Sequence, residues 1–321
     1  MRLLDLLNLE TGASAETLFR IISTAPVRYK VYEIPKRNGG TRTIAHPARE
    51  LKLIQRVILK NILDKVSVSD IAMAYVEGRG IALNAKSHLG QRWILKLDFQ
   101  SFFHSIRPND WDRVVRRTEG LRSYSADTDL FHKILFWGKG GKVPHCLSIG
   151  APTSPTVSNL VCFPLDMWMI EHAKKFELQV TRYADDITIS GDNVAKILKF
   201  EQLLARSLVA NKGLRLGLNP EKRGLYGPGE RRMVTGVVLT PDGLISIGRE
   251  RKREISALIH RFKLRSIDRD LTMRAKGLLA FANSIEPNFG ISMVTKYGDE
   301  TISALMRADP DPDGFVIDFD F

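Results

Sequence analysis

Three aspartates carry the clearest chemical signal in the sequence. Asp98 closes an apolar run at 93–99. Asp185 and Asp186 lie at the bend of a β-rich run at 178–191. Carboxylates that are brought together repel one another and raise each other's pKa unless cations neutralise them. Mg²⁺ suits this task because it binds a few carboxylates together with substrate phosphates, and two such ions can activate a hydroxyl and stabilise a leaving pyrophosphate. The three aspartates therefore predict a two-magnesium site for phosphoryl transfer.

The two adjacent aspartates are not expected to act equally. Successive side chains of a strand point to opposite faces, so Asp185 and Asp186 cannot both face the ions if the backbone is extended there. We expect Asp98 and Asp185 to bridge both ions, and Asp186 to bind one ion peripherally or to tune the local field. Aspartate is also a common turn residue, so an Asp-Asp pair taken alone is better explained as part of a turn.

Hydrophobic periodicity predicts the elements that position these aspartates. Strands are expected at 93–99 and in the two arms of 178–191. A long helix is expected at 156–176, bent at Pro164. A second amphipathic helix should begin after Asp192, whose side chain is expected to cap it. The order strand, helix, hairpin, helix indicates helices on one side of an antiparallel sheet, which is an α+β fold.

A basic hairpin is predicted near the N-terminus. Two β-rich runs within 28–46 flank the turn sequence RNGG at 37–40, whose Asn and glycines suit the positive φ of a tight turn. The apolar positions of 51–66 share one helical face, so a helix should pack behind this hairpin.

The charge of the chain favours a polyanionic partner. Its 321 residues include 48 Lys and Arg against 36 Asp and Glu, which gives a net charge of +12 and a pI near 9.7. Half of this excess lies at 249–276, where ten basic residues accompany four acidic ones. Nucleic acid is therefore the expected partner.

Cysteine count and hydropathy limit the cellular setting. The two cysteines, Cys146 and Cys162, cannot form a disulfide framework or a four-thiolate metal site. No segment approaches the roughly 18 uncharged apolar residues that a membrane span needs. We therefore expect a cytoplasmic protein without a membrane partner.

Five segments, in the right order, resemble the motifs of bacterial retron reverse transcriptases. They are LKLDFQSFF with Asp98, GAPTSPTVSNL with Gly150, RYADD with Tyr183, NPEKR with Lys222 and MVTGVVL with Thr235. The resemblance covers roughly residues 28 to 240, far more than a single short pattern.

Two further matches are typical of the retron branch. Asn84 and His88 match its Asn-Ala-x-x-His signature, and Val234, Thr235 and Gly236 match its Val-Thr-Gly triplet. On a helix, Asn84 and His88 would share a face, so a hydrogen-bonded structural pair explains them as well as a direct contact with RNA does.

The resemblance implies which residues bind the incoming nucleotide. Phe103 would pack under the sugar and exclude a ribose 2′-OH. Phe102 would then be a core residue, because neighbouring strand positions face opposite ways. Lys36 and Arg42 of the hairpin would bind the triphosphate. The backbone carbonyl of Phe99 would be a further metal ligand.

The second motif departs from the family pattern at one position. Many reverse transcriptases have Gln before the Gly-Ala-Pro of this motif, whereas Ile149 precedes Gly150 here. Any contact made by that Gln is therefore not carried over, while the substrate-binding glycine turn at Gly150 is kept.

The resemblance also implies a surface for nucleic acid. The basic helices after Arg249 correspond to a polymerase thumb, whose Lys and Arg side chains track the phosphates of a primer–template duplex. Specificity for one RNA would come from its folded shape, loops and 2′-hydroxyls. The residues expected to contact nucleic acid are Asn84, His88, Tyr183, Lys222, Val234, Thr235, Gly236, Arg251 and Lys252.

The implied enzyme has a right-hand polymerase fold of fingers, palm and helical thumb. Residues 1–240 would form the fingers and palm, and 241–321 the thumb with an acidic C-terminal tail. It would copy RNA into DNA from dNTPs with two Mg²⁺ ions. A dedicated noncoding RNA would be template and primer, and synthesis from an internal guanosine 2′-OH would leave branched RNA-linked single-stranded DNA. Such enzymes act in antiphage defence beside a separate effector protein.

Three alternatives stay open at this point. The chain could be another bacterial reverse transcriptase, of group II intron or abortive-infection type, or a nucleotidyl cyclase with a similar two-metal palm. It could also be a catalytically silent RNA-binding scaffold. The tail at 315–321 alternates apolar and acidic residues, which fits an added edge strand and an unstructured terminus equally.

Overall fold

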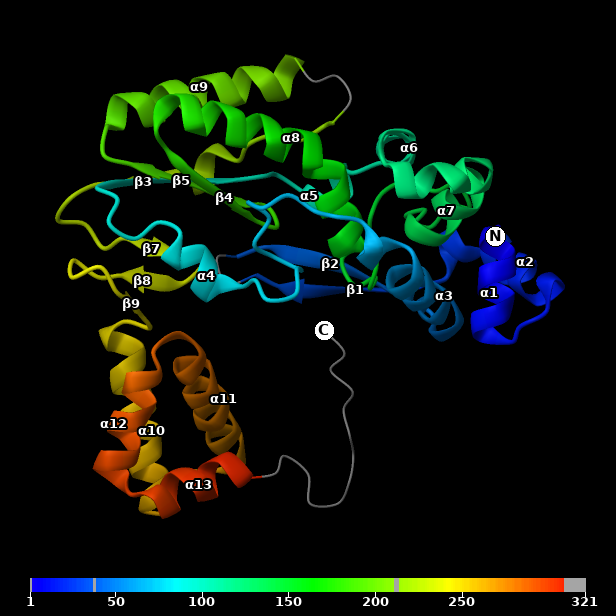
Figure 1. Ribbon diagram of the computed structural model, residues 1–321. Coiled ribbons are helices and arrows are strands. Elements are labelled where there is room, and N and C mark those ends of the chain that lie inside the picture. Colours follow the sequence, from blue (N-terminus) through cyan, green and yellow to red (C-terminus); the bar gives the residue numbers. More distant parts are fainter. Residues whose placement is uncertain (1, 37–38, 211–213, 309–321) are drawn as a thin grey trace. The chain divides into compact units, whose positions relative to one another are not determined.

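The computed structural model describes residues 2–36, 39–210 and 214–308, which form two compact units. The first unit comprises Met1–Gly78 and Leu95–Leu225, and the second comprises Arg79–Ile94 and Tyr226–Phe321. Each unit is described by itself below (Figure 1). The centre of the predicted RNGG turn and the acidic tail from Asp309 lie outside the described residues.

The basic hairpin and the helix behind it are confirmed. Strands β1 (Tyr29–Pro35) and β2 (Thr41–Pro47) pair antiparallel, and α3 (Arg49–Asn61) follows them. The Ala45 N–H of β2 donates a hydrogen bond to the Ile149 carbonyl at 2.9 Å, which joins the hairpin to the second motif. The other elements of this part are α1 (Leu3–Thr11), α2 (Ala15–Ser23), η1 (Ala25–Val27) and η2 (Leu63–Lys65).

A four-stranded sheet forms the centre of the first unit. Its strands are β3 (Trp93–Asp98), β4 (Gln179–Tyr183), β5 (Asp186–Gly191) and β6 (Gly224–Tyr226), in the order β4-β5-β3-β6. Because β3 lies beside β5, the end of β3 meets the turn between β4 and β5. The Phe99 N–H donates to the Asp185 carbonyl at 3.0 Å and fixes this meeting point. Both predicted strand regions are therefore confirmed.

Two long helices cover one side of this sheet, as Figure 1 shows. They are α8 (Ser154–Phe176) and α9 (Val194–Ala210). The expected cap at Asp192 is wrong, because the side chain of Asn193 accepts the Ala195 and Lys196 N–H groups at 2.9 and 3.3 Å. Asn193 is the residue directly before the helix, which is where a cap must stand to reach these groups.

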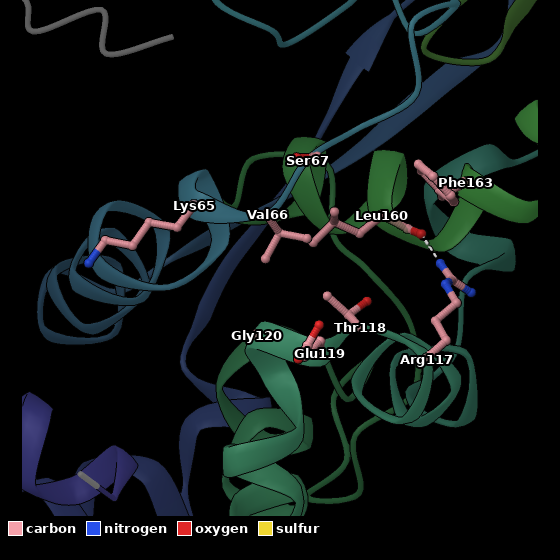
Figure 2. A pocket seen from close by; sticks show the side chains of 9 residues that line it. All are labelled: Lys65, Val66, Ser67, Arg117, Thr118, Glu119, Gly120, Leu160 and Phe163. Atoms are coloured by element: carbon pink, nitrogen blue, oxygen red, sulfur yellow. Dashed lines mark hydrogen bonds between the residues drawn. The ribbon is translucent and has the colours of Figure 1, made fainter.

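Pro164 lies inside α8 and leaves one carbonyl of the helix without its usual donor. That carbonyl belongs to Leu160, four residues earlier, and the guanidinium of Arg117 donates to it instead. Figure 2 shows this contact at the edge of a pocket lined by Val66 and Phe163, among others. The remaining elements of the first unit are α5 (Phe102–Ser105), α6 (Pro108–Arg117), η3 (Glu119–Asp127), α7 (Thr128–Leu135) and η4 (Pro220–Lys222).

The second unit combines a small sheet with helices. Strands β7 (Met233–Val234), β8 (Val237–Leu239) and β9 (Ile245–Ser246) form a sheet in this order. The helices are α4 (Ile81–Lys86), α10 (Arg249–Lys263), α11 (Arg269–Ile285), α12 (Pro287–Tyr297) and α13 (Asp299–Arg307). One apolar core joins the early segment to the later ones, with Ala85 and Ile94 packed among residues such as Val237, Ile255 and Leu279.

The early segment 79–94 therefore packs with the C-terminal part of the chain. The boundary expected at 240 and 241 between a polymerase core and a thumb stays a prediction, because compact units describe packing and not function. Among the described residues, no helix has both the length and the apolar character needed to span a bilayer.

Candidate active site

The three aspartates meet at one end of the central sheet. Asp98 ends β3, Asp185 lies in the turn after β4, and Asp186 begins β5. One carboxylate oxygen from each lies within 4.8 Å of the others. Oδ1 of Asp98 is buried and has no hydrogen-bond partner among the described residues. Carboxylate oxygens suit hard divalent cations, and Oδ1 of Asp98 is left free to accept such a ligand bond, so these residues fit the expected metal ions.

The electrostatics of the cluster also call for cations. Burial, followed by the charge of Asp185 and the neighbouring carboxyl of Asp98, raises the pKa of Asp186 to about 7. Burial, followed by the charge of Asp98, raises the pKa of Asp185 as well. Full ionisation of the cluster at neutral pH is therefore unfavourable until positive charge is brought to it.

Lys222 brings one such charge. Its Nζ donates to Oδ2 of Asp98 at 2.7 Å. Burial alone would lower the pKa of Lys222, but the hydrogen bond to Asp98 and the charges of Asp185 and Asp186 raise it above its ordinary value. The sequence predicted Lys222 as a nucleic-acid contact, whereas its ammonium lies on a carboxylate of the expected metal site.

A buried arginine holds the turn that carries Asp185. Ala184 has a φ of 56°, a conformation that costs a non-glycine residue energy, and its carbonyl accepts a hydrogen bond from Nη1 of Arg182 at 3.1 Å. The Arg182 side chain is fully buried. It forms two 2.7 Å hydrogen bonds with the Asp166 carboxylate and one of 3.1 Å with Oδ1 of Asn159.

The buried cluster around Arg182 also holds residues 71–74 in place. The backbone N–H of Arg182 donates to the Ile71 carbonyl at 2.7 Å, and the backbone carbonyl of Arg182 accepts from the Met73 N–H at 2.8 Å. Nδ2 of Asn159 donates to the Ala74 carbonyl at 2.9 Å. Sequence reasoning missed Arg182 and Asn159. The available signal was that Arg182 is the one charged residue of the strand Gln179–Tyr183.

A cavity of about 580 Å³ opens beside the aspartates. Most of the residues predicted for metal and nucleotide binding line it, namely Lys36, Arg42, Asp98, Phe99, Phe103 and Asp185, together with Lys222. Asp186, the third predicted carboxylate ligand, is not among its lining residues. Tyr75, His104 and Asn219, which the sequence did not single out, line it as well.

Phe102 and Phe103 differ in exposure, but not for the expected reason. Both begin helix α5 and do not continue the strand, because β3 ends at Asp98. Phe102 is buried and stacks on Phe99 with ring centroids 5.9 Å apart, while Phe103 is half-buried. The direction of both rings thus follows from the start of a helix and not from strand alternation.

Gly150 is required by the close approach of the fingers hairpin. Its φ is 121°, and a Cβ atom there would lie 3.1 Å from the Ala45 carbonyl oxygen. Gly150 is not among the residues that line the cavity, whereas Ile149 is. The described structure therefore gives Gly150 a packing function, and its expected contact with substrate stays a prediction.

The retron-type residues gather in the second unit. Asn84 and His88 are buried, and Nδ2 of Asn84 donates to Oγ1 of Thr235 at 3.3 Å. Helix α4 ends at Lys86, so His88 lies in the following turn and not on the same regular helix, contrary to the expectation. Burial lowers the pKa of His88 to about 4, so its imidazole is neutral at physiological pH.

The Val-Thr-Gly triplet comprises the last residue of β7 and the tight turn that leads to β8. Val234 is fully buried, and Thr235 and Gly236 have φ values of 46° and 81°. The Gly236 carbonyl accepts a hydrogen bond from Nη1 of Arg251 at 2.7 Å, and the guanidinium of Arg251 lies 5.3 Å from the ring centre of Phe281.

Other expected nucleic-acid contacts also have partners within the chain. Lys252 forms an ion pair with Glu286 and lies 5.7 Å from the ring centre of Phe289. Tyr183 is half-buried and pairs with Asp186 across the β4–β5 hairpin. Their contacts with RNA or DNA stay predictions.

Comparisons with known proteins agree with this geometry. The family model described as reverse transcriptase (RNA-dependent DNA polymerase) matches residues 34–239. The retron Ec83 reverse transcriptase of Escherichia coli is 35% identical over 289 residues, which cover 89% of this chain and 92% of the relative. The retron Ec86 reverse transcriptase of the same organism is 36% identical, with coverages of 78% and 75%.

A solved structure shows the same fold at low identity. The telomerase of Candida albicans, in complex with a fragment of telomeric RNA, has a TM-score of 0.50 and 10% identity. The match covers 88% of this chain and 61% of the telomerase chain. The fold, the gathered aspartates and the two retron relatives lead to one conclusion: the chain belongs to the reverse transcriptase family of RNA-directed DNA polymerases, within its retron branch.

Proposed function

We propose that this enzyme copies a cognate structured noncoding RNA into branched, RNA-linked single-stranded DNA. The observation that carries the proposal is one cavity in which Asp98 and Asp185 of the three-carboxylate cluster meet Lys36, Arg42 and Phe103. Carboxylates for metal, cations for a triphosphate and an aromatic ring for a sugar are the groups that nucleotidyl transfer requires.

Two Mg²⁺ ions are the proposed cofactor. Asp98 and Asp185 would hold both, Asp186 would bind one peripherally, and the Phe99 carbonyl would be a further ligand. When bound, the ions would supply the charge that activates the attacking hydroxyl and stabilises the leaving pyrophosphate.

The side chains of the cavity have separate proposed tasks. Lys36 and Arg42 bind the dNTP triphosphate, and Gly150 keeps the hairpin that carries them close to the palm. Phe103 packs under the sugar and excludes a ribose 2′-OH. Lys222 keeps its proton because the carboxylates raise its pKa, so it offers a cation to the phosphates once it leaves Asp98.

Recognition of RNA is proposed for the second unit. The basic residues of α10 and α11, including Arg251 and Lys252, would track phosphates, so affinity should fall with salt. The turn from Val234 to Gly236 would lie near the primer end. Tyr183, which belongs to the first unit, is proposed to contact nucleic acid as well. Asn84 and His88 are buried, so we propose that they act by shaping this turn.

The biological setting is likewise a proposal that rests on the retron relatives. An internal guanosine 2′-OH of the RNA would start synthesis in the bacterial cytoplasm. The product would act in antiphage defence together with a separate effector protein.

Primer extension tests the enzymatic part. The purified protein should extend a labelled primer on RNA with dNTPs and Mg²⁺, and Asp185→Asn should abolish extension. Asp242→Asn, in the exposed turn between β8 and β9, is the matched control and should extend normally. If Asp185→Asn polymerised as well as the wild type, the proposed mechanism would be wrong, and a scaffold that only binds RNA would explain the protein better.

Sequencing the nucleic acid that copurifies with the protein tests the retron part. Branched DNA joined to RNA through a 2′-linkage is the expected finding. Unbranched DNA, or RNA alone, would point to a different class of bacterial reverse transcriptase.

A further inference from the structure

Tyr75 has a strained backbone at the edge of the nucleotide cavity. Its φ is 61°, a left-handed conformation that a bulky aromatic residue adopts only where the surrounding structure enforces it. The side chain is nevertheless 50% exposed, so burial of the ring in a core does not explain the strain. Residues held in this way gather at ligand sites, which makes the surroundings of Tyr75 informative.

The ring of Tyr75 faces the groups that handle the nucleotide. Its centre lies 6.5 Å from that of Phe103, with the two planes tilted by 54°. Tyr75 lines the cavity together with Arg42 and Asp185. Burial raises the pKa of the Tyr75 hydroxyl, the charge of Asp185 raises it further and Arg42 opposes this, so the phenol stays neutral.

Hydrogen bonds on the preceding residues hold this conformation. The Met73 N–H donates to the Arg182 carbonyl, and the Ala74 carbonyl accepts from Asn159 at 2.9 Å. Because Arg182 also holds the turn before Asp185, one buried cluster fixes both the Tyr75 backbone and the catalytic turn. A rigid aromatic ring at a fixed position is well suited to bind a flat ligand.

We propose that Tyr75 and Phe103 together form an aromatic wall against which the incoming deoxynucleotide packs, with its base on Tyr75 and its sugar on Phe103. A nucleobase has a π-face, and stacking on an aromatic side chain is tolerant of sequence, so Tyr75 would raise the affinity for all four dNTPs. This inference rests on the proposed polymerase function and assigns a further binding residue to it.

Replacement of Tyr75 by Asn separates binding from folding. Asn tolerates the left-handed conformation, so Tyr75→Asn relieves backbone strain while it removes the ring. We expect a thermal midpoint equal to or above that of the wild type, together with a KM for dNTPs raised at least about fivefold and a smaller change in kcat. Tyr75→Phe keeps the ring and should keep the wild-type KM.

Glu177→Asn is the matched control. Glu177 has a φ of 56° at the end of α8, is exposed, and lies outside the cavity. This variant should match the relief of strain in Tyr75→Asn without any change in KM.

Several results would overturn the inference. They are an unchanged KM in Tyr75→Asn, a loss in Tyr75→Phe as large as in Tyr75→Asn, or a weaker affinity for the RNA template with an unchanged KM for dNTPs. A Tyr75→Asn chain that unfolds at the assay temperature would show that the ring stabilises the fold, and would overturn it too. A wild-type chain that extends no primer would overturn the proposed function and this inference together. The two failures can be distinguished, because failure of the proposed function appears in the unsubstituted protein, whereas failure of this inference alone appears only in the variants.

Discussion

Two tight hairpin turns, one in each unit, are built by the same device. Each contains a non-glycine residue in a left-handed conformation, Ala184 with a φ of 56° and Thr235 with a φ of 46°. In each, an arginine donates to a carbonyl of the turn, Arg182 to Ala184 and Arg251 to Gly236. An asparagine also contributes in each unit: Asn159 accepts a hydrogen bond from Arg182, and Asn84 donates one to Thr235.

The two turns differ in charge and burial. Arg182 is fully buried against the Asp166 carboxylate, and its turn carries Asp185. Arg251 is only half-buried, lies over the Phe281 ring, and its turn carries no acid. A hydrogen bond from an arginine is therefore a general way to hold a left-handed turn in place. Only the turn that also carries a carboxylate can bind metal ions.

The largest effect should come from the carboxylates themselves. Asp98→Asn should lower the rate of primer extension roughly a thousandfold, because it removes the proposed shared metal ligand and the partner of Lys222. Asp186→Asn should lower it less, since Asp186 is the expected peripheral ligand. Single-turnover extension at saturating Mg²⁺ measures both, and equal losses would contradict the unequal roles.

The two arginines should differ in their cost to stability. Arg182→Met leaves the Asp166 carboxylate buried without its partner and should lower the free energy of unfolding by about 3–5 kcal/mol. Arg251→Met removes a half-exposed hydrogen bond and should cost about 1 kcal/mol. Urea denaturation measures both values.

A double substitution sharpens this contrast. Arg182→Met combined with Asp166→Leu should recover most of the stability, because an apolar pair of similar size replaces the buried ion pair. It should not recover primer extension, since the Ala184 carbonyl would still lack its donor. Recovery of both properties would mean that Arg182 serves the fold alone.

The pH dependence of stability provides the next contrast. The pKa of His88 is about 4 in the folded chain and near 6.5 when unfolded, so the unfolded state binds the proton first as pH falls. The contribution of the neutral His88 imidazole to the free energy of unfolding is fully present above pH 6.5. It is lost as the pH falls to 4, by roughly 3 kcal/mol in total. His88→Gln should flatten this part of the pH profile, and an unchanged slope would contradict the buried neutral imidazole.

The smallest effects concern strain in the two turns. Ala184→Gly removes the strain of the Cβ atom and adds backbone entropy to the unfolded chain, so stability should change by less than about 1 kcal/mol. Thr235→Gly also removes the hydroxyl oxygen that accepts a hydrogen bond from Asn84. It should therefore lose about 1 kcal/mol more of the free energy of unfolding than Ala184→Gly does. Thermal unfolding of the two variants tests this order.

The sequence predicted the parts of the site that depend on local patterns. The hairpin at 28–46, the strands around the aspartates and the long helix before them follow from periodicity and turn residues. The gathering of Asp98 with Asp185 and Asp186 could be anticipated because each lies at a strand end.

The missed features depend on contacts between distant segments. Burial of Arg182 is tolerable only because Asp166 and Asn159 lie beside it on α8, which strand periodicity does not reveal. The left-handed backbone of Tyr75 depends on the same cluster. Phe102 and Phe103 differ in exposure because a helix starts at Phe102, shortly after the end of β3, which periodicity did not predict.

The split composition of the second unit has a consequence for how the protein is made. Segment 79–94 leaves the ribosome long before its packing partners, since Tyr226 follows Ile94 by 132 positions. At a synthesis rate of 5–20 residues per second, Ala85 and Ile94 wait roughly 7–26 seconds before synthesis of the later part of their core begins. A nascent or truncated chain therefore leaves the apolar side chains of this segment, such as Ala85 and Ile94, without the partners that bury them, and chaperone binding should include this segment.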